Sequence, residues 1–295
     1  CLKSQCPPPY NLKPSQQVET IVAMAVYAGD NAIWITEAIN SIIGQTYRQF
    51  LFVIVVDGDV SKAIAQSIEN ARACDERIVV LQNDKNIGLA SSMNKAIALG
   101  LECNAQYFVR MDADDISEQH RLQRQISYLK KHLNIDVLGS ALTEINEQGV
   151  KVGSRVMPAS HKQIVNILPR RCSMNHPTVV IRYKLFHDGH RYIDSFKNTQ
   201  DYFMWINLAA EGYIFRNLKD KLLKFRRVND FYKRRGLSKS INEFKARLLA
   251  MTKLRQFSVY NIAYASSVLL LRLLPSWVVR LAYKLDRHLL ERFGK

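Results

Sequence analysis

The acidic element Asp112-Ala113-Asp114-Asp115 carries the strongest sign of chemistry in the chain, and it directly follows the apolar run 106–111. Three carboxylates within four residues repel one another unless a cation or a basic neighbour compensates their charge. Mg²⁺ and Mn²⁺ are suited to a few carboxylates combined with the oxygens of a bound phosphate. A helix N-terminus also attracts acids, but it accounts for Asp114 and Asp115 rather than for all three. The element therefore predicts a site for Mn²⁺ or Mg²⁺.

Two other apolar runs also end in acid-containing turns. The first ends at Tyr27 and Asp30, and the second ends at Asp57 and Asp59. Taken singly, such an acid is commonly a helix cap or part of a solvated loop. In an open α/β sheet, however, the carboxyl ends of the parallel strands meet at one edge, where ligands bind. Three acidic turns at one edge favour a binding site there.

Two phosphate-binding signatures are absent from the chain. No Gly-x-Gly-x-x-Gly follows the first apolar run, and no Gly-Lys-Ser/Thr loop occurs. Both signatures use glycines to bring backbone amides close to phosphate oxygens. The dinucleotide-binding dehydrogenases and the phosphate-loop NTPases therefore lack their diagnostic features here.

The elements that must position these acids alternate along the first half of the chain. Apolar, β-branched runs typical of buried strands occupy residues 21–27, 50–56, 78–81 and 106–111. Apolar residues recur at helical spacing within 30–43, 61–71 and 89–100. The alternation predicts an α/β fold with a Rossmann-like, mostly parallel sheet that helices cover on both faces.

The second half of the chain is less regular. Its pattern predicts a helix over 116–132, short strands over 135–139 and 178–182, and another helix over 201–211. Residues 216–240 are basic and are expected to be irregular. Residues 241–257 have the pattern of a basic amphipathic helix.

The composition is that of a globular protein. The 295 residues are 47% apolar and 23% charged, which excludes a disordered, collagenous or low-complexity chain. The five cysteines are scattered without a Cys-x-x-Cys pair, so neither a zinc site nor a disulfide framework is expected. Residues 1–15 have no secretory pattern, and charges and a proline interrupt the apolar segment 262–285. We therefore expect a cytoplasmic protein without a membrane-spanning helix.

The net charge of +16 is concentrated at the C-terminal end. The first 215 residues hold 22 Lys/Arg and 21 Asp/Glu, whereas residues 216–295 hold 20 Lys/Arg and 5 Asp/Glu. Such a tail attracts an anionic partner. The basic runs 224–227 and 233–235 and the apolar stretch 268–281 favour an anionic membrane surface. A solvated face is the plain alternative, and no nucleic acid is expected as a partner because no recognised motif for it occurs.

Six motifs follow one another along residues 18–235. They are Tyr27 followed by 38–47, then 56–58, 86–90, 110–115, 175–178 and 200–205. Together they resemble family-2 glycosyltransferases of the GT-A fold, of the type that builds bacterial surface polysaccharides or lipooligosaccharides. Any one motif would be weak evidence, whereas six in order form a specific signal.

The resemblance implies a role for each matching residue. The implied nucleotide-sugar site comprises Tyr27, Asp57, Asp59, Asn86, Arg110 and Asp112. The contact to the nucleotide falls on either Asp57 or Asp59, because the chain reads Asp-Gly-Asp-Val where the family commonly has Asp-Asp-Gly-Ser. Asp114 is the implied ligand of a Mn²⁺ or Mg²⁺ ion on the diphosphate.

The same resemblance makes Asp201 the general base. Gln200 precedes it where the family commonly has Glu, which changes the polarity beside the base. His176 and Gln200 are candidate contacts of the diphosphate or the acceptor. For His176, a structural role is the alternative.

The implied reaction is a metal-dependent, inverting transfer of a hexose. The donor is a nucleotide-diphosphate sugar, in particular a UDP-sugar, and the acceptor is a hydroxyl of a glycan or of a lipid-linked molecule. A sugar-phosphate nucleotidyltransferase is one alternative, although the glycine-rich loop usual for it is absent from 27–31. A non-catalytic membrane- or nucleic-acid-binding protein is another, although it would not need the acids at 112, 114 and 201.

Three regions are expected. Residues 1–17 form an N-terminal extension, 18–235 a GT-A glycosyltransferase domain, and 236–295 a basic, helical, membrane-associating region. This division places the protein peripherally on the inner face of the cell membrane.

Overall fold

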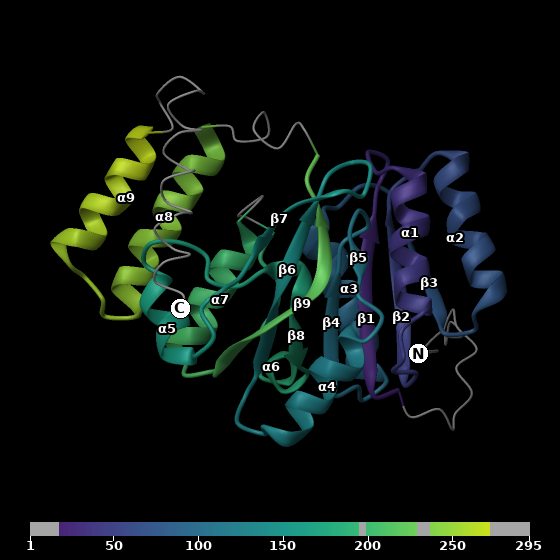
Figure 1. The fold of residues 1–295 in the computed structure, drawn as a ribbon, viewed down its shortest axis with the longest axis horizontal. Helices are drawn as coiled ribbons and strands as arrows, with labels where there is room; N and C mark the ends of the chain where they lie inside the picture. The colour runs from purple at the N-terminus through teal and green to yellow at the C-terminus, as the bar shows by residue number, and fades with distance from the viewer. Residues whose placement is uncertain (1–17, 195–198, 229–236, 272–295) are drawn as a thin grey trace, which may run out of the picture.

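The computed structural model describes residues 18–194, 199–228 and 237–271, and nine strands in that part of the chain form one mixed sheet. The strands are β1 Thr20–Val26, β2 Phe50–Asp57, β3 Ile78–Asn83, β4 Tyr107–Met111, β5 Ile116–Ser117, β6 Val137–Ile145, β7 Lys151–Arg155, β8 Val180–Arg182 and β9 Phe215–Arg226. They lie in the order β3-β2-β1-β4-β8-β6-β9-β5, with β7 paired to β6 (Figure 1). The expected α/β class is confirmed.

The first four strands are parallel to one another. All eight residues of β2 are buried, as a continuous β-branched and aromatic run requires when both faces of a sheet are covered. Because the strands are parallel, the residues that follow β1, β2 and β4 all leave the sheet at one edge. That edge carries the acids that the sequence singles out.

Helices connect and cover the strands. They are α1 Ala32–Ile43, α2 Lys62–Cys74, α3 Leu89–Glu102, α4 Arg121–Lys131, α5 His161–Ile167, the 3₁₀ turn η1 His176–Thr178, α6 Lys184–His187, α7 Gln200–Ala210, α8 Leu237–Lys253 and α9 Val259–Leu271. Local sequence starts several of them: the Asn31 side chain caps α1, and Ser160 with Gln163 forms a capping box on α5.

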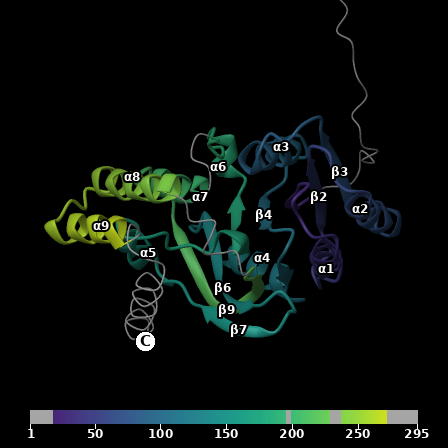
Figure 2. The same cartoon turned by 90° about the horizontal axis from the view of Figure 1, so that it is seen from above.

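Two hydrophobic clusters lie on opposite faces of the sheet. One contains side chains of α3, α5, α6, α7 and α8, and the other contains side chains of α1, α2 and α4. Neighbouring strand residues such as Ala23 and Met24 point into different clusters, as the two-residue period of a strand requires. Figure 2 shows α3 and α1 on the two sides of β1 and β2.

The expectation of an irregular segment over 216–240 is wrong for its first part, because β9 runs from Phe215 to Arg226. β9 pairs in parallel with β6 and antiparallel with β5. Its register against β6 shifts on either side of Ala141, so its apolar and polar residues do not alternate regularly. The shifts remove the period of two by which a strand is recognised in a sequence.

The expected helix over 116–132 is also shorter than the pattern indicated. Residues Ile116 and Ser117 instead form β5, which pairs with Lys224 and Leu223 of β9. The α4 helix begins only at Arg121. A pairing between residues more than a hundred positions apart therefore overrides the local helical pattern.

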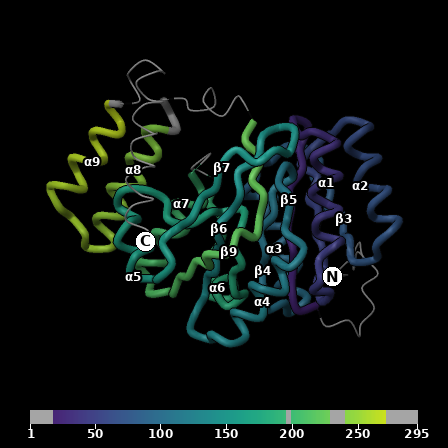
Figure 3. The backbone as a smooth tube through the Cα atoms, in the orientation of Figure 1, coloured from purple at the N-terminus to yellow at the C-terminus, as the bar shows by residue number. Residues whose placement is uncertain are grey.

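The C-terminal helices pack on the rest of the molecule. α8 contacts α7, and α9 contacts α8, so the two helices lie on the side of α7 away from β1 and β2 (Figure 3). Ala246 and Ala250 of α8 belong to the same hydrophobic cluster as Trp205 of α7. The domain boundary expected at residue 235 therefore lies just before α8, whose side chains belong to the same hydrophobic cluster as side chains of the sheet.

No helix among the described residues is both long and apolar enough to cross a bilayer. The basic run 233–235 and residues 272–281 of the expected apolar anchor lie outside the described residues.

Candidate active site

The turn after β2 is held by the carboxylate of Asp57. Its oxygens accept hydrogen bonds from Asn83 Nδ2, Ile87 N and Gly88 N, each at 2.8 Å. Gly88 has a φ of +89°, a left-handed conformation that glycine adopts without strain. Asp57 is buried, and it thereby fixes the loop 84–88 and the start of α3 against the end of β2.

A groove of about 480 Å³ lies beside this turn. Its lining residues are Gly58, Asp59, Val60, Gln82, Asn83 and Asp84, at the carboxyl ends of β2 and β3. Asp59 is exposed there, whereas Asp57 is buried and has three donors. The sequence left open whether Asp57 or Asp59 contacts a ligand, and Asp59 is the one that faces the groove.

Tyr27 and Asn86 lie on the same edge. Tyr27 is 42% exposed, its N–H donates to Asp30 Oδ2 at 2.9 Å, and its ring lies against Gly29. Asn86 Nδ2 donates to the carbonyl oxygen of Asp57 at 3.4 Å. The ends of β1 and β2 thus present an aromatic ring, an amide and a carboxylate.

The end of β4 presents a buried arginine. Arg110 is 1% exposed and forms an ion pair with Asp112. Its Nε donates to His176 Nε2 at 3.2 Å. One guanidinium therefore joins the acidic element after β4 to the turn η1 and sets the direction of the Asp112 carboxylate.

The histidine turn is held by its flanking residues. Asn175 Nδ2 donates to the carbonyl oxygen of Ser140 at 2.9 Å, and Thr178 Oγ1 accepts from Ser140 N at 2.9 Å. Since Arg110 donates to Nε2 of His176, that ring nitrogen carries no proton. Burial, and next the charge of Arg110, hold the pKa of His176 well below its usual range. His176 is therefore neutral, with its proton on Nδ1.

The three acids of the element after β4 have different surroundings. Asp115 is fully buried, and its Oδ1 accepts from Arg226 N at 2.9 Å. Asp114 is partly exposed, and burial and the charge of Asp112 raise its pKa to about 6. Asp112 and Asp114 therefore remain as the carboxylates able to meet a ligand.

These two carboxylates fit a divalent cation. The repulsion that raises the pKa of Asp114 is the kind that a bound cation removes. Among the described residues no group of three His, Cys, Asp or Glu side chains forms a complete metal site. Two carboxylates are a donor set that Mg²⁺ and Mn²⁺ accept when phosphate oxygens and water supply the other ligands.

Two buried arginines support this element from behind. The Nε atom of Arg226 donates to the carbonyl oxygen of Asp114 at 3.0 Å, and its guanidinium pairs with Glu37 of α1. Arg121 NH2 donates to the carbonyl oxygens of Arg110 and Pro177 at 2.8 and 2.9 Å. Burial lowers the pKa of Arg121 to about 10, which leaves it charged at neutral pH.

Asp201 lies in the first turn of α7, where the helix dipole favours a carboxylate. Gln200 is the first residue of the helix, and both side chains are partly exposed. Trp205, one turn further along α7, is fully buried, and its ring lies 6.0 Å from that of His176. The base candidate is thus connected to η1 through the packing of α7.

Tyr192 joins the two halves of the site. Its ring lies edge-on to that of His176 at 5.7 Å. Burial raises the pKa of its phenol, and the charges of Arg110, Asp201 and Asp112 also act on it, the first lowering it and the other two raising it. The rings of Tyr192 and of Trp205 on α7 thus both lie beside His176, which Arg110 contacts from the end of β4.

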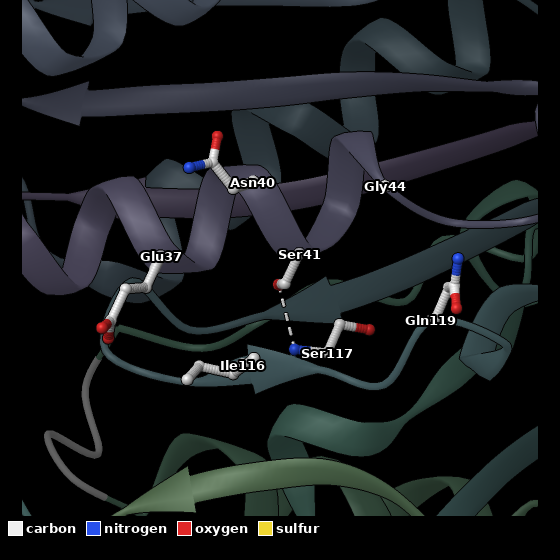
Figure 4. Close-up of a pocket in the computed structure, with 7 residues that line it drawn as sticks. All are labelled: Glu37, Asn40, Ser41, Gly44, Ile116, Ser117 and Gln119. Carbon is white, nitrogen blue, oxygen red and sulfur yellow. Dashed lines mark hydrogen bonds between the residues drawn. The ribbon is translucent and has the colours of Figure 1, made fainter. Parts of the chain in front are cut away.

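A second groove, of about 490 Å³, lies apart from these residues. It runs between α1 and β5 and is lined by Glu37, Asn40, Ser41, Gly44, Ile116, Ser117 and Gln119 (Figure 4). Ser117 N donates to Ser41 Oγ across it at 3.0 Å. None of its lining residues is a predicted site residue, although Asn40, Ser41 and Gly44 belong to the motif 38–47. Its link to the candidate site is the Glu37–Arg226 ion pair.

The structure thus places the predicted residues at one edge of the sheet, in two groups. Tyr27, Asp57, Asp59 and Asn86 lie at the ends of β1 and β2, whereas Arg110, Asp112, Asp114, His176 and Asp201 lie around the end of β4 and the start of α7. Sequence reasoning missed Tyr192, Arg121 and Arg226. Nothing local marks Tyr192, and Arg226 was read as part of a basic surface because β9 was not recognised.

A family model described as "Glycosyl transferase family 2" matches residues 22–188. Three curated relatives cover most of the chain. An uncharacterized glycosyltransferase of Methanocaldococcus jannaschii is 30% identical over 70% of this chain and 70% of its own length. The amylovoran biosynthesis glycosyltransferase AmsE of Erwinia amylovora is 28% identical over 90% and 98%. The UDP-Gal:alpha-D-GlcNAc-diphosphoundecaprenol beta-1,3-galactosyltransferase of Escherichia coli is 25% identical over 83% and 84%.

Two solved structures share the fold. Residues 1–349 of S. aureus TarS in complex with UDP-GlcNAc superpose with a TM-score of 0.62 at 18% identity, over 85% of this chain and 70% of that one. This chain spans 42% of the longer TarS chain. The mannosyltransferase PcManGT of Pyrobaculum calidifontis, in complex with GDP-Man and Mn²⁺, gives 0.54 at 13% identity, over 94% and 82%. The arrangement of strands and helices is therefore that of GT-A proteins.

Proposed function

This chain belongs to glycosyl transferase family 2, and from that membership we propose that it transfers a hexose, with inversion, from a UDP-sugar to a hydroxyl of a glycan or lipid-linked acceptor. The observation that carries the proposal is that two elements meet at His176. Arg110, which pairs with Asp112, donates to His176 Nε2, and Trp205, one turn after Asp201 on α7, has its ring 6.0 Å from that of His176. An inverting transfer needs the leaving group and the acceptor on opposite sides of one sugar, with residues for each close together. The names of the Erwinia and Escherichia relatives support a role in polysaccharide assembly.

Donor binding begins at the ends of β1 and β2. We assign the nucleotide to the groove beside Asp59, with Tyr27 and Asn86 next to it. Asp57 orders the loop from within, since its carboxylate is already held by three donors. The backbone of this edge is therefore set before the donor arrives, which lowers the entropy cost of binding.

The diphosphate lies toward Asp112 and Asp114 in this proposal. These two carboxylates would hold Mn²⁺ or Mg²⁺, and the PcManGT complex with Mn²⁺ supports the choice of metal. When bound, the ion supplies Lewis-acid compensation of the charge that develops on the leaving diphosphate. Arg110 orients the Asp112 carboxylate through their ion pair. Neutral His176 accepts from Arg110 through Nε2, so the proton on its Nδ1 remains for a hydrogen bond to the donor.

Asp201 is the proposed general base. It accepts the proton of the acceptor hydroxyl while the hydroxyl oxygen forms a bond to the anomeric carbon. The bond from that carbon to the diphosphate oxygen breaks, and the nucleoside diphosphate leaves with the electron pair. A single displacement inverts the anomeric centre, so an α-linked donor gives a β-glycoside.

The test compares Asp201→Asn with wild type on a panel of UDP-sugars and GDP-Man in the presence of Mn²⁺. Turnover should fall about 10²–10⁴-fold because a general base is lost. Affinity for the donor should stay within about twofold, because the base contacts the acceptor. Glu211→Gln, at the other end of the same helix, is the matched control and should keep its activity. Equal loss of donor affinity in Asp201→Asn would assign Asp201 to the donor site instead.

The product identifies the reaction class. A glycosyltransferase releases a nucleoside diphosphate, whereas a nucleotidyltransferase releases pyrophosphate. Pyrophosphate release, or binding without turnover of any donor or acceptor, would replace the proposed function with one of the two alternatives.

We also propose that the chain binds the inner face of the cell membrane through its C-terminal region. The apolar side chains of Phe257, Val259, Tyr260 and Leu270 are 62–85% exposed on and beside α9. Such side chains next to a basic region suit shallow insertion into an anionic surface.

The described cysteines Cys74, Cys103 and Cys172 are free thiols, which suits a reducing compartment.

A further inference from the structure

Three buried polar atoms beside the candidate site have no hydrogen-bond partner in the described part of the chain. They are His176 Nδ1, Tyr192 Oη and Trp205 Nε1. Their rings lie together, since the His176 ring is 5.7 Å from that of Tyr192 and 6.0 Å from that of Trp205. Buried polar atoms in proteins are nearly always paired, so three unpaired ones in one cluster require an explanation.

All three atoms can donate a hydrogen bond. The indole Nε1 is a donor only, and a phenol donates through its O–H. His176 Nδ1 carries the ring proton because Nε2 accepts from Arg110 Nε. The cluster is therefore rich in donors and poor in acceptors. Its complement is a ligand that presents several oxygen acceptors, as a sugar does.

Tyr192 is the best placed of the three. Asn94 of α3 holds its backbone on both sides, with Asn94 Oδ1 accepting from Tyr192 N at 3.0 Å and Asn94 Nδ2 donating to Tyr192 O at 2.9 Å. The residue is 5% exposed, and its edge-on contact with His176 fixes the ring. The hydroxyl is thus rigidly positioned although no residue within 18–194, 199–228 and 237–271 pairs with it.

The contacts of His176, beside Tyr192, show which part of a donor would reach the cluster. Arg110, which pairs with Asp112 on the side assigned to the leaving diphosphate, donates to His176, and Trp205 lies one turn after Asp201, on the side assigned to the acceptor. The group between leaving group and acceptor is the sugar that is transferred. The nucleotide groove at the ends of β2 and β3 is a separate place.

We propose that the Tyr192 hydroxyl binds the sugar of the donor and contributes to the choice of sugar. This inference rests on the proposed function, because it takes the assignment of the diphosphate and acceptor sides from it. An internal water shared by the three donors is the rival explanation, since buried water commonly satisfies such atoms.

Tyr192→Phe removes the hydroxyl alone and is the direct test. The binding of UDP and of the UDP-sugars UDP-Glc, UDP-Gal and UDP-GlcNAc is measured by calorimetry with Mn²⁺ present. Loss of one hydrogen bond should weaken the best-bound UDP-sugar about 3–10-fold. UDP should bind within twofold of wild type, because it has no sugar to contact Tyr192. The differences in affinity between the three sugars should also shrink.

Tyr183→Phe is the matched control. The Tyr183 hydroxyl is also buried and without a partner, but it lies against Gly100 of α3 and packs with Phe108 and Phe186. Its removal should change neither UDP nor UDP-sugar affinity. A change of similar size in both variants would mean a general effect of losing a buried hydroxyl and would overturn the proposal.

The outcomes separate the two levels of inference. Wild type that binds UDP-sugars, with Tyr192→Phe binding them equally well, overturns the role of Tyr192 and leaves the proposed function standing. Equal weakening of UDP and UDP-sugar places Tyr192 at the nucleotide and also overturns it. Wild type that binds no sugar nucleotide overturns the proposed function and this inference together.

Discussion

At the scale of single residues, the neighbouring carboxylates of Asp112, Asp114 and Asp115 differ in their burial and in the groups that they contact. Asp115 is buried and holds the backbone of β9, Asp112 pairs with Arg110, and Asp114 is partly exposed with a raised pKa. The sequence presents them as one acidic element. The division among them depends on which buried arginine or backbone amide each one meets.

Asp114→Asn should lower turnover about 100-fold or more, because the proposed cation would lose a carboxylate ligand while the shape of the side chain is kept. The melting temperature should stay close to that of wild type. Rates of nucleoside diphosphate release are measured over a range of Mn²⁺ concentrations. Asp115→Asn is the control, and its activity should keep the wild-type dependence on Mn²⁺. Full wild-type activity in excess chelator would contradict the role of the metal.

His161 offers a prediction about pH. Its Nδ1 accepts from Phe215 N at 3.2 Å, and burial lowers its pKa below 6.5. Above about pH 6.5 the ring is neutral in both the folded and the unfolded chain, so the folded state keeps its full stability. Below that pH the unfolded chain takes up the proton first, and the free energy of unfolding should fall until the folded pKa is passed.

The measurement is the free energy of unfolding of wild type and His161→Gln between about pH 5 and pH 8. The variant should show a smaller decrease at low pH. His187→Gln changes an exposed histidine at the end of α6 and should follow the wild-type curve. Identical curves for all three proteins would show that His161 does not couple protonation to folding.

At the scale of the elements, β9 decides how the site is supported. It enters the sheet between β6 and β5, and its last residue, Arg226, reaches Asp114, Glu147 and Glu37. A strand that begins in the basic C-terminal part of the chain thereby fixes the loop after β4. Residues Lys224 and Arg227 likewise pair with Glu118 and Glu144.

Arg226→Leu should lower the free energy of unfolding by about 2–3 kcal/mol, because several buried acceptors lose a charged donor. Chemical denaturation measures the loss. Arg124→Leu is the control, since its ion pair with Asp220 is largely exposed and should contribute less than about 1 kcal/mol. Equal losses in the two variants would contradict the supporting role of Arg226. The turnover of Arg226→Leu should also fall, because the loop 112–114 loses the hydrogen bond from Arg226 to the carbonyl oxygen of Asp114.

At the scale of the whole molecule, the excess positive charge divides into two parts. Some of it makes hydrogen bonds to the rest of the chain: buried Arg247 donates through Nε to the carbonyl oxygen of Arg170 at 2.7 Å, and exposed Lys253 donates to Asn207 at 2.8 Å. The apolar side chains on and beside α9 remain exposed. The proposed membrane partner would cover them.

The combined replacement Phe257→Ser, Val259→Ser and Leu270→Ser tests this surface. It should strongly reduce flotation with anionic vesicles and leave the melting temperature unchanged, because all three side chains are exposed. Replacement of Ile33 and Leu133 by Ser, which are 70% and 78% exposed elsewhere, is the control. Binding of wild type should weaken as salt is raised. Flotation of the triple variant at the wild-type level would reject α9 as the contact.

The sequence by itself determined the α/β class, the parallel strands β1 to β4 and the edge at which the acids gather. These features follow from apolar runs and from helical spacing, which local residues encode. Asp112 and Asp114 could be selected for the same reason, because they directly follow a recognisable strand, whereas Asp201 was selected through the resemblance to the family.

Only the tertiary structure decided the rest. The pairing of β9 with β5 and β6, the Arg226 contacts, and the meeting of Tyr192 with His176 and Arg110 join residues far apart in the chain. Such contacts form because each side chain finds its partner by packing. The spacing of residues along the sequence does not predict these contacts. Their interaction energy depends on pairs of residues that are distant in the chain and not on the residues of one segment.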